Sequence, residues 1–174
     1  SPVTALRIRS IGFPMKTPIK TALVIGATGY IGRHLVHKLT QQQVEVYGLS
    51  RHGDTKAKNW RSIEGDLLNP EFPKLLSEIQ PDVIFLATST DRNNPLKEQL
   101  MTHVDNTRHL LRSIIDVQSD AKIILLGSAA EYGLPAEPVS EEAPCKPVNE
   151  YGVCKLAQTQ VAQLFARRYN LPLQ

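Results

Sequence analysis

The sequence contains little cysteine, no long apolar run and no concentration of charge of one sign. Cys145 and Cys154 are too few for a disulfide framework, and neither belongs to a metal-ligand spacing, so we expect no metal site and a reducing, cytoplasmic compartment. No apolar stretch approaches the roughly 18 residues needed to cross a membrane. The net charge is only +3 and the basic residues are scattered. We therefore expect neither a membrane nor nucleic acid as a partner.

Residues 1–18 differ in character from the rest of the chain. They contain three prolines and several basic residues, and they lack the continuous apolar centre of a secretory signal. Met15 stands just before the first apolar run, as a natural start would, so residues 1–14 are interpreted as an upstream extension. We predict a disordered N-terminal tail over residues 1–18 and one folded domain over residues 19–174.

The most informative segment joins an apolar run to three evenly spaced glycines. Residues 22–25 lead directly into Gly26, Gly29 and Gly32. Apolar residues at helical spacing follow, at Ile31, Leu35, Val36 and Leu39. The pattern predicts a buried strand, a glycine turn that lets the backbone approach a pyrophosphate, and a helix whose free N–H groups face that anion. The alternative is an ordinary strand-to-helix turn that needs glycine for backbone reasons.

Strand-like and helix-like segments alternate along the remainder of the chain. Further strands are predicted over residues 44–50, 60–64, 83–87 and 122–126. Helices are predicted over residues 71–79, 96–117 and, after the cap Asn149, to about residue 169, and residues 171–173 resemble the opening of a sixth strand. The apolar side expected for the helix over residues 96–117 consists of Leu100, Val104, Leu111, Ile114 and Ile115. This alternation predicts an α/β fold with a doubly wound parallel sheet in the order 3-2-1-4-5. Such a sheet binds its ligand at the carboxyl ends of the strands, here between strands 1 and 4.

The end of the second predicted strand bears on the choice of a dinucleotide cofactor. This place often holds an acid that binds the ribose 2′-hydroxyl, whereas a nearby arginine accommodates a 2′-phosphate. Here the strand ends in Ser50, Arg51 and His52, which favours NADP over NAD. The alternative is a solvated loop arginine. Asp66, after the third strand, either accepts a hydrogen bond from the adenine amino group or caps a turn.

Three residues in the second half of the chain are candidates for chemistry. Tyr151 and Lys155 are four positions apart and share a helix face, and Ser128 follows the fifth strand. A phenol is a poor base at neutral pH because its reference pKa is about 10, and a neighbouring ammonium stabilises the phenolate. The three groups suit hydride chemistry at a carbinol or ketone. The alternative is a Tyr151 packed at the helix start and a solvated Lys155.

Together these motifs resemble the extended short-chain dehydrogenase/reductases, a Rossmann-fold family, in their nucleotide-sugar epimerase/dehydratase branch. The resemblance covers about residues 21–173 and is carried by residues 26–32, 65–67, 86–87, 128–133 and 151–155. Within the branch, the segments 46–51, 127–133 and 147–152 are most similar to those of GDP-4-keto-6-deoxymannose reductases.

The resemblance implies roles for individual residues. Ser128 becomes the carbonyl polariser, Tyr151 the acid/base and Lys155 its electrostatic partner. It also implies NADP, or NAD, as the cofactor, a nucleotide-sugar substrate and a homodimer in the full-length protein. The implied cofactor contacts are Gly26, Thr28, Gly29, Tyr30, Ile31, Gly32, Ser50, Arg51, Asp66, Leu67, Leu86, Ala87, Tyr151 and Lys155.

The chain also departs from the family pattern. Dehydratases of the family carry acids where this chain has Ala129 and Ala130, and Glu131 stands one step off, which favours a reductase or epimerase. His103 and Asn106 replace the family's usual Asn and Gly. Family chains are longer, and the half that supplies most of the sugar-nucleotide pocket is missing here, so the fold is expected to be truncated after the nucleotide-binding half.

Three functions therefore remain open. The first is NAD(P)-dependent reduction or epimerisation of a nucleotide-linked keto-sugar through Ser128, Tyr151 and Lys155. The second is an NADP-binding domain without turnover, serving as a sensor or a degenerate paralogue. The third is a short-chain reductase of a non-sugar ketone, against which the similarity of residues 128–133 to the sugar branch argues.

Overall fold

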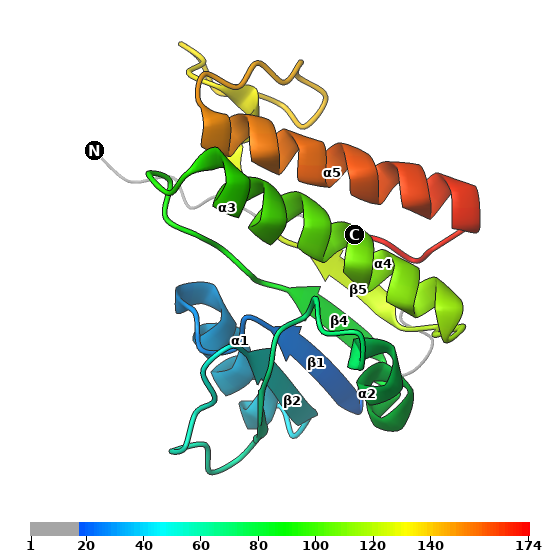
Figure 1. Ribbon diagram of the computed structural model, residues 1–174. Helices are drawn as coiled ribbons and strands as arrows, with labels where there is room; N and C mark the ends of the chain where they lie inside the picture. The colour runs from blue at the N-terminus through cyan, green and yellow to red at the C-terminus, as the bar shows by residue number, and fades with distance from the viewer. Residues whose placement is uncertain (1–17) are drawn as a thin grey trace.

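The computed structural model describes residues 18–174. Residues 1–17 of the predicted tail lie outside the described residues. The described part is a parallel sheet with helices on both faces (Figure 1). Within it, no helix is both long and apolar enough to cross a membrane.

Five parallel strands form the sheet in the order β3-β2-β1-β4-β5, which confirms the predicted topology. The strands are β1 (Thr21–Ile25), β2 (Glu45–Ser50), β3 (Arg61–Glu64), β4 (Val83–Leu86) and β5 (Lys122–Leu125). Ile25 at the end of β1 is in register with Leu49 of β2 and Leu86 of β4. Three neighbouring strands therefore end together, which creates one continuous edge for a ligand.

Alternate residues of β1 enter two different cores, as expected for a strand covered on both faces. Ala22 and Val24 belong to the cluster that packs under α1 (Tyr30–Gln41). Leu23 and Ile25 belong to the cluster shared with three helices on the opposite face. These helices are α2 (Phe72–Ile79), α4 (Asn106–Asp116) and α5 (Glu150–Tyr169).

The long helix predicted over residues 96–117 is not regular. It consists of α3 (Leu96–Leu100), a π-helical segment η1 (Met101–Asp105) and α4. The predicted apolar side included Leu100 and Val104, but Leu100 is exposed and Val104 only half-buried. A widened π turn changes the face that a helix presents, and the buried residues here are the polar Gln99, His103 and Thr107.

The chain ends beside β5. Residues 171–173 form a single parallel bridge, Ile123 to Leu173, together with backbone hydrogen bonds from Ile123 to Pro172 and from Leu125 to Gln174. The predicted sixth strand is thus begun but not extended. A short 3₁₀ helix, η2 (Ala129–Tyr132), which the sequence pattern did not predict, follows β5.

Candidate active site

A cavity of about 500 Å³ lies at the carboxyl ends of β1, β2 and β4. This is the place where parallel α/β sheets bind ligands. Ten of the residues predicted to contact a cofactor line it: Gly26, Thr28, Gly29, Tyr30, Ile31, Ser50, Arg51, Asp66, Leu67 and Ala87. Gly32 and Leu86 are buried behind this wall instead.

The glycine turn forms a tight cradle at one side of the cavity. Gly26 has a φ of 87°, and a Cβ on this residue would lie 2.8 Å from the carbonyl oxygen of Ala87, the residue that follows β4. A Cβ on Gly32 would overlap the Gly26 carbonyl, so Gly32 lets α1 pack closely on the turn. Gly29 caps α1, whose first turn contains no acid among its described residues. The open positive end of α1 therefore fits a diphosphate group.

The tip of β2 contributes one buried and one exposed side chain. Ser50 is buried, and its hydroxyl accepts a hydrogen bond of 3.1 Å from the Thr28 N–H, so it holds the glycine turn as well as lining the cavity. Arg51 is exposed. Asp66 accepts a hydrogen bond of 2.9 Å from the Leu68 N–H, so the turn-capping role considered for it is present.

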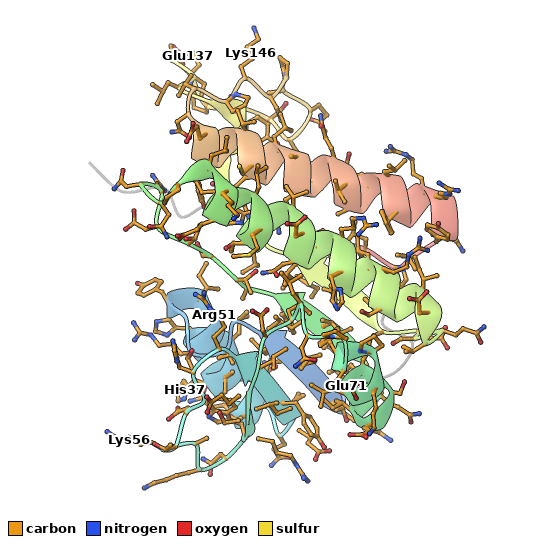
Figure 2. All side chains as sticks on the ribbon, viewed as in Figure 1. His37, Arg51, Lys56, Glu71, Glu137 and Lys146 are labelled. Atoms are coloured by element: carbon orange, nitrogen blue, oxygen red, sulfur yellow. The ribbon has the colours of Figure 1, made fainter. Side chains whose placement is uncertain are left out.

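A second cavity of about 640 Å³ adjoins the first, sharing Thr28 and His52 with it. Basic and imidazole side chains gather around it: Arg33, His37, His52, Lys56 and Lys58. Figure 2 shows Arg51, His37 and Lys56 on the same side of the molecule, around α1 and the chain after β2. Of these basic residues, only the neighbouring Arg51 was predicted from the sequence as a cofactor contact. Lys56 and Lys58 follow Arg51 in the same loop, and this concentration of positive charge could have indicated the second cavity.

Ser128 and Glu131 form a capping box at the start of η2. The Ser128 hydroxyl accepts from the Ala130 N–H at 3.2 Å, and the Ser128 N–H donates to the Glu131 carboxylate at 2.8 Å. The other carboxylate oxygen of Glu131 accepts from the Thr159 hydroxyl at 2.9 Å, which ties η2 to α5. Ser128 keeps its own O–H available as a donor. Glu131 is buried in this network.

Tyr151 lies in the first turn of α5, where the Asn149 side chain caps the helix by accepting from the Gly152 N–H at 2.8 Å. Its ring meets the His103 ring edge-on, with centroids 5.5 Å apart. The Arg92 guanidinium carbon lies 5.2 Å from the centre of the Tyr151 ring. Tyr151 is therefore held between η1 and the loop that precedes α3.

Lys155 is buried rather than solvated, which excludes the alternative of a surface lysine. Its ammonium donates to the Leu126 carbonyl and to the Gln158 side-chain oxygen, each at 2.5 Å. Burial lowers the pKa of Lys155 to about 8, and the Glu131 carboxylate acts in the opposite direction. The ammonium is therefore the charged form at neutral pH but lies close to its titration range.

His103 is completely buried, and neither ring nitrogen has a hydrogen-bond partner among residues 18–174. Burial, and next the charge of Lys155, lower the pKa of His103 to about 4. The imidazole is therefore neutral at physiological pH, so it adds no charge beside Tyr151.

The predicted residues thus form two groups. The glycine turn and the tips of β2 and β4 surround the cavity, while Ser128, Tyr151 and Lys155 gather where η2 and α5 meet the end of β5. The second group does not line the cavity in the described residues. The tie between Lys155 and the Leu126 carbonyl places it against the same edge of the sheet.

Comparison with known proteins gives consistent matches. A model of the NAD dependent epimerase/dehydratase family matches residues 22–173. The dTDP-6-deoxy-L-talose 4-dehydrogenase (NAD(P)(+)) of Kitasatospora kifunensis is 32% identical over 152 residues, covering 84% of this chain and 48% of the relative. The UDP-glucose 4-epimerase of Streptococcus mutans is 30% identical over 161 residues, covering 86% of this chain and 48% of the relative.

A solved structure of MoeE5 in complex with UDP-glucuronic acid and NAD superimposes with a TM-score of 0.78 at 29% identity, covering 88% of this chain and 52% of that one. The chain spans about half the length of the curated relatives it matches. The family match extends over nearly all of the described residues and includes every predicted motif. This chain belongs to the NAD-dependent epimerase/dehydratase family of Rossmann-fold, nucleotide-sugar enzymes.

Proposed function

We propose that this chain is the cofactor-binding half of an enzyme that reduces or epimerises a nucleotide-linked keto-sugar by hydride transfer. The observation that carries the proposal is the buried Lys155 ammonium on the same helix as Tyr151, held against the sheet edge at which the glycine-lined cavity lies. An ammonium is costly to bury unless it is hydrogen-bonded. Its retention here supports a functional use of the charge.

Each residue of the proposed site has a chemical role. The glycine turn and the tips of β2 and β4 would hold the dinucleotide, whose chemistry would be to supply or accept a hydride. Tyr151 gives a proton to the carbonyl oxygen during reduction and takes it back in the reverse direction. Lys155 stabilises the phenolate that remains, and Ser128 donates a hydrogen bond to the same carbonyl oxygen.

Elimination chemistry is disfavoured because the acid it needs is absent from the expected place. Ala129 and Ala130 occupy the positions at which the dehydratases that this chain resembles have acidic residues. The carboxylate oxygens of Glu131 are engaged by the Ser128 N–H and the Thr159 hydroxyl. We therefore propose a reductase or an epimerase rather than a dehydratase.

For the cofactor we propose a preference for NADP. Arg51 lines the first cavity, and Arg33, Lys56 and Lys58 surround the second, which begins at the same Thr28 and His52. A 2′-phosphate placed between the two cavities would meet several positive charges, whereas a 2′-hydroxyl would gain little from them.

For assembly we propose a homodimer. The outward faces of α3 and α5 carry exposed apolar side chains, among them Leu100, Val153 and Leu164. Val153 and Leu164 are eleven positions apart, which returns to nearly the same helix face after three turns. Apolar groups gathered on two neighbouring helices support an interface with a second copy.

The proposal is tested by separating binding from turnover. Calorimetric titration of this chain with NADP and NAD should give saturable binding, while keto-sugar reduction is measured in a longer form. Tyr151→Phe should retain cofactor binding in both forms and abolish turnover in the longer one, because the ring stays and the exchangeable proton is lost. We expect little or no turnover from the 174-residue chain itself. A fully active Tyr151→Phe enzyme would contradict the proposed site.

A further inference from the structure

Gln158 is a buried amide directly beside the buried ammonium. It lies three positions after Lys155 on α5 and is only 1% exposed. Its side-chain oxygen accepts a hydrogen bond of 2.5 Å from the Lys155 ammonium. Burying an amide costs free energy unless it is paired, and an apolar side chain would fill this position without that cost. The choice of glutamine therefore indicates a function beyond packing.

The two acceptors of Lys155 determine where its remaining proton points. An ammonium carries three N–H donors in a tetrahedral arrangement. One N–H is taken by the Leu126 carbonyl at the end of β5 and a second by Gln158 on α5. Because these acceptors belong to two different elements, they fix both the position of the nitrogen and its rotation. Among residues 18–174 the third N–H has no acceptor, and the other two bonds fix the direction in which it points.

Gln158 holds the ammonium without neutralising it. The neighbouring carboxylate of Glu131 is hydrogen-bonded to the Ser128 N–H and the Thr159 hydroxyl, so it attracts Lys155 only through space. A neutral amide keeps the full positive charge available to a phenolate, whereas a carboxylate in direct contact would compensate it. Among the described residues, the titratable or charged groups beside Lys155 and Tyr151 include Glu131 of η2, His103 of η1, Glu150 and Cys154 of α5, and Arg92 of the loop before α3.

We propose that Gln158 is a positioning residue that aims the Lys155 ammonium at Tyr151 and at the cofactor ribose. This inference rests on the proposed function, since it assigns Gln158 a task in the Tyr151–Lys155 pair. Gln158 touches neither substrate nor cofactor and acts through Lys155 alone.

The test follows the titration of Lys155 by heteronuclear NMR of its side-chain nitrogen and adjacent carbon in the cofactor-free chain. Three variants are compared: Gln158→Leu, Gln158→Glu and the matched control Gln160→Leu, an exposed glutamine two positions along the same helix. Gln158→Leu removes an acceptor from the charged form, so the midpoint should fall by about one pH unit. Gln158→Glu adds a negative charge, so the midpoint should rise, and Gln160→Leu should leave it unchanged.

Cofactor affinity provides the second readout. In Gln158→Leu, NADP affinity should fall about tenfold at pH 8, because Lys155 is protonated in fewer molecules and its ammonium is no longer held in a fixed orientation. A lower melting temperature with an unchanged Lys155 midpoint and unchanged affinity would mean that Gln158 only packs, and would overturn the inference. If Gln158→Leu does not fold, Gln158→Glu must still raise the midpoint. Failure of the wild-type chain to bind any dinucleotide would reject the proposed function, while the titration would still decide the role of Gln158.

Discussion

Arg51 is an exposed guanidinium at the end of β2, on the rim of the glycine-lined cavity. A charge-assisted hydrogen bond to a 2′-phosphate is worth about 1.5–3 kcal/mol. Arg51→Ala should therefore weaken NADP binding roughly tenfold to a hundredfold and leave NAD binding nearly unchanged. The sole tryptophan, Trp60, lines the adjoining cavity, so its fluorescence can follow the titration.

The matched control for this prediction is Arg112→Ala, which removes an exposed arginine of α4 that lines neither cavity. It should change neither affinity. Equal binding of NAD and NADP by the unmodified chain would refute the proposed preference, and the cations of the second cavity would then be a solvated surface.

The π segment η1 explains what sequence periodicity missed in the long helix. A regular helix through Leu100 and Val104 was expected because these apolar residues have the right spacing. The structure instead buries Gln99 and His103 against the helix that carries Tyr151. Periodicity counts apolar residues, so it cannot anticipate that a polar face is buried for the sake of a neighbouring site.

This buried histidine should make stability depend on acid. The pKa of His103 is lowered from 6.5 to about 4 by burial, so between these values the unfolded chain binds a proton that the folded chain does not. Folding stability should therefore fall as the pH decreases from 6.5 toward 4. His103→Asn should lose less stability over that interval than the parent chain, as measured by urea unfolding at pH 7 and pH 5.

The control is His37→Asn, which replaces an exposed histidine of α1 and should keep the parent's acid sensitivity (Figure 2). Identical pH profiles for His103→Asn and the parent would contradict this prediction. They would show that groups other than His103 cause the loss of stability in acid.

The strand order of the sheet could be predicted from the sequence, but the burial of Lys155 and its contacts could not. The alternation of strands and helices predicts a parallel sheet with right-handed crossovers, and the Gly26–Gly29–Gly32 turn after the first strand predicts a dinucleotide fold, whose usual strand order is the one observed. Tyr151 and Lys155 could be paired from their spacing alone. The burial of Lys155 and its contact with the Leu126 carbonyl could not be predicted from the sequence, since they depend on where β5 ends relative to α5. Long-range contacts of this kind leave no local pattern in the sequence.

Exposed apolar side chains on two neighbouring helices favour self-association of the whole molecule. Leu100, Val153 and Leu164 are each 41–54% exposed on α3 and α5, which lie beside each other (Figure 1). Complete burial of a fully exposed leucine contributes about 1.5–3 kcal/mol, and each of these half-exposed side chains would gain about half of that in an interface. We therefore expect light scattering to give the mass of two chains. Leu164→Glu should shift the mass to one chain at the same concentration, because it places a charge in the apolar interface.

Gln163→Glu introduces the same charge one position away, on an exposed residue outside the apolar face, and should leave the dimer intact. The comparison also separates this interface from a second apolar surface, where Phe85 of β4 and Ile124 of β5 are only half-buried. Association through that sheet face would survive Leu164→Glu, because Leu164 lies on α5 and not on the sheet. A persistent dimer in Leu164→Glu would therefore move the interface from the helices to the sheet.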